Sequence, residues 1–493
     1  MQTGTLIALA IYFIAMLGIG FYAWRKSTQN VEGYLLGGRD LGPAVTALSA
    51  GASDMSGWLM LGLPGAIFLS GLGQAWIGIG LVIGAYLNYR LVAPRLRTYT
   101  ELAGDAITVP DYFEERFHDK SHALRLVSAL VIIVFFALYT SAGMVAGGKF
   151  AVSAMGMDYL TGILLMGGIV VVYTVMGGFL AVSLTDFVQG CIMFIALVLV
   201  PLVAYLELGN GFGPALAAAE ASRGLSLTQM IGGDVTLLAI ISAAAWGLGY
   251  FGQPHIIVRF MAIRNVKDMP TARRINIGWM TVSLIGAVLT GLIGAAYFAA
   301  NGGAPKDAET VFLLLSKILF HPFIAGFVLA AVLAAIMSTI SSQLLVTSSS
   351  LTEDIYRTFL NREASEKQLV TIGRACVALV SVVAGVLALD PESTVLGIVG
   401  NAWAGFGAAF GPAIIFSLRW KRTTRQGVLA GMVVGALVVI GWILAGWSST
   451  LYEIVPGFIA SSIAIWLVSK ATAEPDAAIQ NQFDQAADAA KGA

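Results

Sequence analysis

One carboxylate, Asp54, lies near the middle of a stretch, residues 42–70, that otherwise has the composition of a membrane span. A charged side chain in hydrocarbon is costly, and intramembrane carboxylates usually face a polar cavity and carry function. The surrounding sequence, SAGASDMSGW at 49–58, is rich in glycine and serine, which hold a straight helix poorly. We therefore expect the backbone to open here and to expose carbonyls beside the carboxylate, a pocket suited to a hard cation. The alternative is a carboxylate satisfied by neighbouring hydroxyls for packing alone.

The composition indicates a membrane protein. Of 493 residues, 58% are hydrophobic and 11% are charged, whereas a soluble domain carries about twice that share of charge. The formal net charge is zero, which argues against a nucleic-acid partner. The two cysteines, Cys191 and Cys376, lie in apolar stretches without a metal-ligand pattern, and no nucleotide-binding loop is present, which argues against an ATP-driven pump.

Apolar stretches of membrane-spanning length predict thirteen candidate helices. The first has no basic segment before it and is followed by Arg25 and Lys26, so we expect a retained span and not a secretory signal. The predicted spans are residues 5–24, 42–70, 73–93, 123–148, 160–176, 182–206, 236–257, 277–300, 310–350, 369–389, 395–418, 427–447 and 451–470.

The basic residues are distributed unevenly over the predicted loops. With the N-terminus outside and the C-terminus inside, all but four of the 28 Lys and Arg residues fall in inner loops or the tail, and Arg259 is counted among them. The exceptions are Lys149, Arg223, Lys306 and Lys317. Because cytoplasmic loops carry an excess of Lys and Arg, this distribution supports the predicted topology.

A second carboxylate of interest is Asp186, in SLTD at 183–186, near the inner end of the sixth predicted span. Two interpretations fit it equally: a helix N-cap or interfacial residue, or a residue of the ion path. Asp54 is the one acidic residue that we expect deep inside a span.

The seventh predicted span carries a second interruption, WGLGYFGQPH at 246–255. Three glycines and a proline so close together would unwind or kink a helix. The second to sixth spans and the seventh to eleventh spans form two sets of five, and each set begins with an interrupted helix. Since an odd number of spans inverts the second copy in the membrane, matched interruptions point to a transporter's site near the midplane. Glycines also serve close helix packing, so one such run alone would be weak evidence.

The ninth predicted span holds a cluster of hydroxyls, AAIMSTISSQ at 334–343. Ser338 and Thr339 follow Ala335 by three and four residues, so they project over the same helix face as its carbonyl. Such hydroxyls commonly bond the carbonyl one turn earlier, which is the structural alternative. The density of hydroxyls favours a functional role, because two hydroxyls and a few free carbonyls suit Na⁺ better than a metal that demands carboxylates.

The motifs at 49–58 and 247–255, with MSTI at 337–340, closely resemble the sodium/solute symporter family, and the resemblance runs from the first to the thirteenth span. It implies an all-α polytopic membrane protein of about 13 transmembrane helices, with a leucine-transporter-type 5+5 inverted-repeat core and broken second and seventh helices. The predicted segments are the first transmembrane helix and inner loop at 1–41, five-helix repeats at 42–234 and 235–424, two C-terminal helices at 425–470 and a cytoplasmic tail at 471–493.

The resemblance implies a transporter and not an enzyme: sodium-coupled secondary active uptake of L-proline by alternating access across the bacterial cytoplasmic (inner) membrane. Na⁺ is the cotransported ion and no cofactor is implied. The expected partners are L-proline, Na⁺ and membrane lipids, with neither nucleic acid nor an obligate protein partner.

The resemblance also assigns site residues. Asp54 is implied in sodium coupling, either as a ligand or by tuning the pocket. Arg39 and Asp186 match positions of an ion path or gate. The implied sodium ligands are the carbonyls of Ala52, Met55 and Ala335 and the hydroxyls of Ser338 and Thr339; the implied substrate-binding residues are Ser56, Gly57, Trp58, Tyr139, Trp246, Tyr250 and Pro254.

Elementary chemistry agrees with a small zwitterionic ligand. The aromatic faces of Tyr139, Trp246 and Tyr250 can stack on a pyrrolidine ring, and free amides near Ser56–Trp58 can receive a carboxylate. Each aromatic residue alone would be interpreted as membrane core packing. The alternatives that remain are uptake of another small zwitterionic or organic solute, or coupling to H⁺ or Li⁺. A transporter-like sensor would need a signalling domain after residue 470, and a channel would need a pore lined by repeated motifs, so both are disfavoured.

Overall fold

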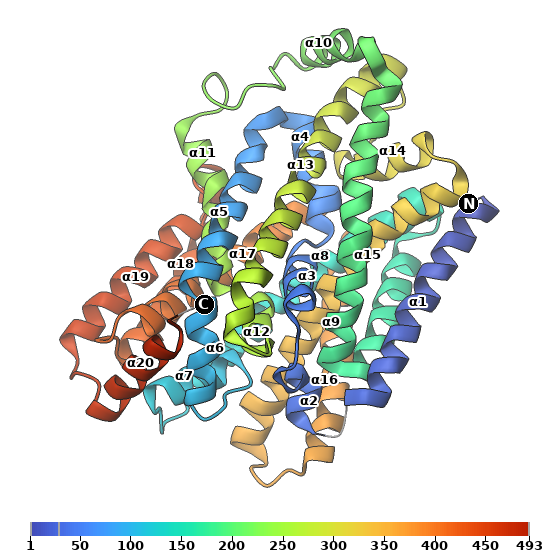
Figure 1. Cartoon of the computed structure of the whole chain (residues 1–493). Coiled ribbons are helices and arrows are strands. Elements are labelled where there is room, and N and C mark those ends of the chain that lie inside the picture. Colours follow the sequence, from blue (N-terminus) through green and yellow to red (C-terminus); the bar gives the residue numbers. More distant parts are fainter. Residues whose placement is uncertain (1, 28–29, 492–493) are drawn as a thin grey trace.

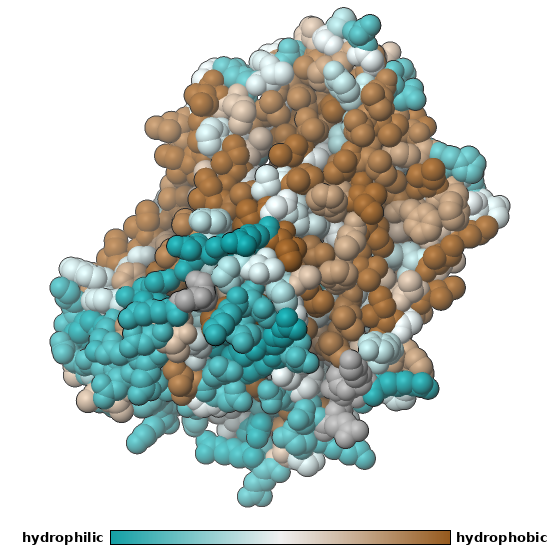
Figure 2. Space-filling model, in the orientation of Figure 1, coloured by the Kyte–Doolittle hydropathy of each residue, from teal (hydrophilic) through white to brown (hydrophobic). Residues whose placement is uncertain are grey.

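The computed structural model describes residues 2–27 and 30–491; residues 1, 28, 29, 492 and 493, which belong to the predicted first segment and tail, lie outside the described residues. Every named element of the described chain is helical, and most helices run between the two ends of one elongated body (Figure 1). Figure 2 shows hydrophobic surface over the middle and upper parts of this body and hydrophilic residues gathered at its lower end.

The first half of the chain begins with α1 and leads through a broken helix into long apolar helices. Its helices are α1 (Thr3–Ser27), α2 (Val31–Leu36), α3 (Pro43–Asp54), α4 (Leu63–Ser70), α5 (Ala75–Leu91), α6 (Ala93–Leu102), α7 (Val109–Phe117), α8 (Ala123–Phe150), α9 (Tyr159–Leu208) and α10 (Phe212–Arg223).

The second half begins with another broken helix and ends in a short helix on the hydrophilic end. Its helices are α11 (Leu237–Ala244), α12 (Pro254–Ala262), α13 (Met269–Asn301), α14 (Val311–Leu319), α15 (Pro322–Ser349), α16 (Glu366–Leu387), α17 (Val395–Arg419), α18 (Arg425–Leu444), α19 (Ile454–Ala471) and α20 (Ala477–Ala489).

Several helices start where the side chain of a Ser, Thr or Asp accepts a hydrogen bond from a backbone N–H in the first turn, which satisfies a group that the helix itself leaves unpaired. In this way Thr108 begins α7, Asp158 begins α9, Thr236 begins α11, Ser365 begins α16, Thr424 begins α18 and Asp476 begins α20.

The number of spans differs from the sequence prediction. Within residues 2–27 and 30–491, ten helices are long and apolar enough to cross a membrane, so the predicted count of thirteen is not confirmed. Part of the difference is that continuous helical stretches contain more than one predicted span, as in Trp58–Leu102 and Tyr159–Arg223. The broken seventh span is also too short to be counted, because its apolar helical part covers only Leu237–Gly252.

Helix α9 has 50 residues, about twice what a bilayer requires. Gly178 interrupts it with φ 56° and ψ −146°, and a Cβ there would lie 2.5 Å from the carbonyl oxygen of Tyr34. Glycine is needed at this position because other residues rarely adopt this conformation and would clash here. The interruption separates the predicted fifth and sixth spans, 160–176 and 182–206.

The structure divides one predicted span and adds a helix to the predicted tail. The single predicted span 310–350 is a short α14 and a long α15, because the backbone leaves the helix at Phe320 and restarts at Pro322, the first residue of α15. The predicted tail at 471–493 contains α20, which packs on α6 with Phe483 largely buried.

Candidate functional site

The first predicted helix break is present at Asp54. Helix α3 ends at this residue, Met55 follows with φ −77° and ψ 68°, and the chain resumes as a π-helical turn, Trp58–Gly62, before α4. The backbone carbonyl of Asp54 accepts hydrogen bonds from the N–H of Ser56 at 2.8 Å and from the indole of Trp58 at 3.2 Å. The Gly-Ser composition therefore opens the helix at the carboxylate, as the sequence predicts.

The second predicted break follows α11. Residues Ala245–Gly252 form a 3₁₀ segment, Gln253 is extended, and α12 begins at Pro254. The glycines of this segment allow α17 to approach closely: a Cβ on Gly249 would lie 1.9 Å from the indole nitrogen of Trp403, and one on Gly252 would lie 2.3 Å from a backbone oxygen of α17. Helix α12 packs against α3, so the two broken helices lie side by side.

Four of the five predicted sodium ligands are brought together by hydrogen bonds. The hydroxyl of Ser338 donates to the carbonyl of Ala52 at 2.7 Å and approaches the carbonyl of Ala335 at 3.2 Å. The hydroxyl of Thr339 lies 3.3 Å from the same Ala335 carbonyl. The fifth residue, Met55, lies in the break and is fully buried. Two segments far apart in sequence thus place neutral oxygens around one point, the ligand type that suits a monovalent hard cation.

Asp54, two residues after Ala52 in the chain, is fully buried. One carboxylate oxygen accepts a hydrogen bond from the hydroxyl of Tyr250, in the second break. Among the described residues the other oxygen, Oδ1, has no hydrogen-bond partner. A buried acceptor without a donor is costly, which favours a functional role for this carboxylate over packing by neighbouring hydroxyls.

The predicted substrate residues form an aromatic cluster at the two breaks. The rings of Trp58 and Trp246 lie 6.1 Å apart, and Trp246 stacks on Tyr452 at 5.3 Å. The hydroxyl of Tyr139 lies 3.5 Å from the Asp54 carbonyl, which places this ring at the same point. The remaining predicted residues are also buried: Ser56, Gly57, Tyr250 and Pro254.

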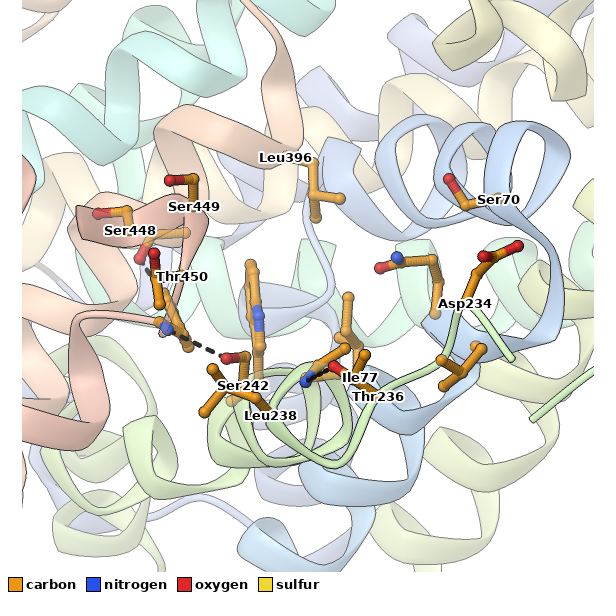
Figure 3. A pocket seen from close by; sticks show the side chains of 18 of the residues that line it. Ser70, Ile77, Asp234, Thr236, Leu238, Ser242, Leu396, Ser448, Ser449 and Thr450 are labelled. Carbon is orange, nitrogen blue, oxygen red and sulfur yellow. Dashed lines mark hydrogen bonds between the residues drawn. The ribbon is translucent and has the colours of Figure 1, made fainter. Parts of the chain in front are cut away.

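A cavity of about 840 Å³ leads from one end of the molecule to this cluster. Figure 3 shows it between the end of α4, the start of α11, the start of α17 and the segment that joins α18 to α19. Ser242 accepts a hydrogen bond from the backbone N–H of Tyr452 across the cavity, at 3.2 Å. Trp246 belongs to its lining. The cavity thus gives a small molecule access to the aromatic cluster from one side.

Asp186 lies in a buried ionic network and not at a helix end. It is inside α9, fully buried, with one oxygen 3.2 Å from the guanidinium of Arg259 and 2.7 Å from the hydroxyl of Ser49. Arg259 also donates to the hydroxyl of Ser342 at 2.6 Å and to Ser49 at 3.1 Å. The N-cap or interfacial interpretation of Asp186 is therefore wrong, since the pair ties α3, α9, α12 and α15 together.

Arg39 joins segments at the hydrophilic end of the molecule. Its guanidinium donates to the carbonyls of Met261 at 3.0 Å and Ala106 at 2.7 Å and pairs with Asp105 at 3.0 Å. Two residues later Leu41 exchanges backbone hydrogen bonds with the end of α12. Arg39 and Leu41 thus fasten the segment before α3 to the end of α12.

Sequence reasoning missed residues that complete the site. Arg259 was counted as an inner-loop residue, but it is fully buried and pairs with Asp186. His255 packs its ring edge-on against Tyr139 at 5.8 Å, and neither ring nitrogen has a hydrogen-bond partner among the described residues. Trp403 contacts the second break from α17. Arg259 follows the predicted seventh span, 236–257, by only two residues, and this closeness was the available signal for it. Neither a histidine nor a tryptophan alone gives such a signal.

The chain belongs to the sodium:solute symporter family, whose model matches residues 34–435. It is a transporter and not an enzyme. Three relatives from bacteria match nearly its whole length. The osmoregulated proline transporter OpuE of Bacillus subtilis (strain 168) is 57% identical over 98% of this chain and 98% of its own. The high-affinity proline transporter PutP of the same strain is 57% identical over 95% and 98%. A sodium/proline symporter of Staphylococcus aureus (strain JH9) is 52% identical over 98% and 96%.

Solved structures establish the fold. A Na⁺-coupled sialic acid symporter in a substrate-bound outward-open state matches with a TM-score of 0.79 at 19% identity, over 96% of this chain and 99% of that one. The nucleobase-cation-symport-1 transporter Mhp1, in a closed conformation, matches with a TM-score of 0.54 at 16% identity, over 92% and 98%. The predicted all-helical, leucine-transporter-type fold with broken second and seventh helices is thereby confirmed.

Proposed function

We propose that this chain couples the inward movement of Na⁺ to the uptake of L-proline across the bacterial cytoplasmic membrane. The observation that carries the proposal is the meeting, at the two helix breaks, of a neutral-oxygen cluster, a buried carboxylate and an aromatic cluster. The relatives named proline transporters and sodium/proline symporter support the same pair of substrates.

In this proposal Na⁺ binds between α3 and α15. Its ligands are the carbonyls of Ala52, Met55 and Ala335 and the hydroxyls of Ser338 and Thr339. The hydroxyl–carbonyl distances of 2.7–3.3 Å support this set. An ion that enters the cluster can contact the same carbonyl oxygens in place of the hydroxyl protons that they now accept. Asp54 supplies the negative charge nearby that favours a cation over neutral solutes.

Proline binds on the other side of Asp54, among Ser56, Gly57, Trp58, Tyr139, Trp246, Tyr250 and Pro254. The faces of Tyr139, Trp246 and Tyr250 receive the apolar ring, and backbone amides of the first break receive the carboxylate in place of their present partners, Asp54 and Ser56. Since Tyr250 contacts the Asp54 carboxylate, occupancy of one site alters the surroundings of the other. This contact gives the two substrates a direct path for coupling.

Alternating access follows from the asymmetry of the molecule. The cavity opens the aromatic cluster to one face, while Arg39, the pairing of Leu41 with α12 and the Asp186–Arg259 pair close the other. We propose that the open face is extracellular, with the N-terminus outside and the C-terminus cytoplasmic. The position of the hydrophilic end, where α7 and α20 lie, supports this orientation (Figures 1 and 2).

The test is uptake of radiolabelled L-proline into proteoliposomes, with sodium and proton gradients imposed separately. We expect accumulation that requires an inward sodium gradient and persists without a pH gradient. Accumulation driven by a pH gradient alone, or preference for a different small solute in competition, would replace the proposal with one of the alternatives.

A further inference from the structure

We propose that Trp403 of α17 is a positioning residue that sets the place of Trp246 and Tyr250, and with it the size of ring that the site accepts. This inference rests on the proposed function. Trp403 is almost fully buried and lies outside the lining of the cavity, so it acts through other residues and not by touching a ligand from that side.

The indole of Trp403 fixes the backbone of the second break. Its Nε1–H donates to the carbonyl of Trp246 at 2.7 Å. Within a helix break, carbonyls lose regular partners one turn away and need another donor when they are buried. This hydrogen bond therefore stabilises the 3₁₀ segment at Trp246, whose side chain lines the cavity.

The same indole also fixes two side chains. Its ring stacks on Trp246 at 6.4 Å with an interplanar angle of 27°, and it meets Tyr250 edge-on at 5.3 Å and 84°. Tyr250 in turn donates to Asp54. One side chain thus supports two of the aromatic faces that the proposal assigns to the proline ring, those of Trp246 and Tyr250.

Trp403 is itself held from the second break. The side-chain amide of Gln253 donates to the carbonyl of Trp403 at 3.1 Å, and Gly249 leaves the room that the indole fills, since a Cβ there would lie 1.9 Å from Nε1. The contact is therefore reciprocal, with hydrogen bonds in both directions between α17 and the second break. Movement of α17 against this segment would shift the aromatic faces together.

The experiment replaces Trp403 with Phe, which keeps an aromatic ring and removes the N–H donor. Proline uptake and its inhibition by L-pipecolate, which has one more ring methylene than proline, are measured in proteoliposomes of equal protein content. We expect the proline KM to rise about three- to tenfold, the range for loss of one buried hydrogen bond. The preference for proline over pipecolate should fall, while the sodium concentration for half-maximal uptake at saturating proline stays within twofold.

The matched control is Tyr159→Phe. The Tyr159 hydroxyl also donates to a backbone carbonyl, that of Ala388 at 2.9 Å, but Tyr159 lies at the start of α9, outside both breaks and the cavity lining. This control should leave the proline KM and the preference unchanged. Benzothienylalanine at position 403, which keeps the indole shape and replaces N–H by sulfur, tests the hydrogen bond should the Phe variant not reach the membrane.

The outcomes separate this inference from the proposed function. Wild-type protein that does not couple sodium to proline uptake overturns the proposed function and this inference with it. A transporting wild type with an unchanged preference in both Trp403 variants overturns the inference alone. An equal loss of proline and sodium affinity, or the same loss in the control, assigns Trp403 a general structural role and also overturns it.

Discussion

The hydroxyl of Tyr250 donates a hydrogen bond to the carboxylate of Asp54, although 196 residues separate them in the chain. Each residue lies in one of the two helix breaks, so this bond joins the two breaks directly. A polar bond in a buried site is stronger than in water, and its loss leaves a carboxylate without a donor.

Replacing Tyr250 with Phe removes this donor and keeps the aromatic ring. We expect the variant to bind proline less tightly and also to need more sodium, by about three- to tenfold in the concentration for half-maximal uptake, since the hydrogen bond ends on Asp54.

Asp54→Asn should cripple sodium-driven uptake while the protein still reaches the membrane. Near-normal uptake by Asp54→Asn at low sodium would contradict the role assigned to the carboxylate.

Removing a hydroxyl from the oxygen cluster should affect sodium specifically. Ser338→Ala and Thr339→Ala each remove one of about five ligands, so we expect sodium half-saturation to rise tenfold or more, as for the loss of a charge-assisted contact of ~1.4 kcal/mol or more. The measurement is proline uptake as a function of sodium at saturating proline.

The control for this pair is Thr347→Ala on the same helix. Thr347 is also fully buried and bonds the carbonyl of Gln343 at 2.7 Å, the ordinary bond to the preceding turn. It should leave sodium dependence unchanged. A shift of the same size in Thr347→Ala would mean that the hydroxyls stabilise α15 and do not bind the ion.

The buried pair of Asp186 and Arg259 gives a prediction on stability. Arg259→Gln leaves a fully buried carboxylate unpaired, which costs about 3–5 kcal/mol, whereas removing both charges in Asp186→Asn with Arg259→Gln costs less than either single change. Thermal unfolding of the purified protein in detergent measures the order. A double variant as unstable as the sum of the single variants would show that the two charges do not stabilise each other.

The C-terminal helix α20 is held to the hydrophilic end by Phe483. Guanidinium groups of Arg116 and Arg95 lie 5.3 and 5.9 Å from its ring, and the side chain is largely buried. Phe483→Ala should release α20 from α6, because burial and the cation–π contacts together contribute about 2–4 kcal/mol. Faster amide exchange over 477–489 measures this.

A surface ion pair between α20 and the segment that joins α17 to α18 provides the comparison. Lys421 and Asp484 lie 2.5 Å apart with side chains 41% and 53% exposed, and such exposed pairs contribute about 1 kcal/mol or less. Asp484→Asn should leave exchange over α20 nearly unchanged. Equal exchange in the Phe483 variant and the wild type would mean that α20 is held by other contacts.

The sequence predicted the parts of the site that depend on local chemistry. Dense clusters of glycine with serine or proline weaken a helix through local chemistry, so the breaks at Asp54 and at 246–255 could be located without a structure. The stacking of hydroxyls after Ala335 follows from the helical period alone. These features need no knowledge of which helices touch.

Features that depend on packing between distant segments could not be predicted. Hydropathy does not distinguish an arginine at a membrane surface from one buried against a carboxylate, so Arg259 was assigned to a loop. The kink at Gly178 arises where the backbone of Tyr34 comes close, and the division of 310–350 arises where the chain turns at Phe320. A hydropathy window averages over both features. Nothing in the sequence around Trp403 indicates that this residue lies against the second break.

Transport should move net charge inward. Proline is a zwitterion at neutral pH, so each cotransported sodium carries one positive charge across the membrane. An inside-negative potential of ~100 mV supplies roughly 2.3 kcal/mol per charge, or about a 50-fold accumulation of proline with equal sodium on both sides. The measurement imposes a potassium diffusion potential with valinomycin on proteoliposomes that hold the same sodium concentration inside and outside. Proline should accumulate, and collapse of the potential should release it.

The matched control is the Asp54→Asn variant in the same vesicles, which should not accumulate proline under the same potential. If uptake by the wild type does not depend on the potential, simple sodium–proline symport is ruled out. The transport cycle would then be electroneutral, which requires that a compensating charge returns or that a second ion is exchanged. Accumulation that follows a pH gradient and ignores sodium would make H⁺ the coupling ion. The Asp54 carboxylate, with one oxygen on Tyr250 and the other without a partner among the described residues, would then be the group that takes up and releases the proton.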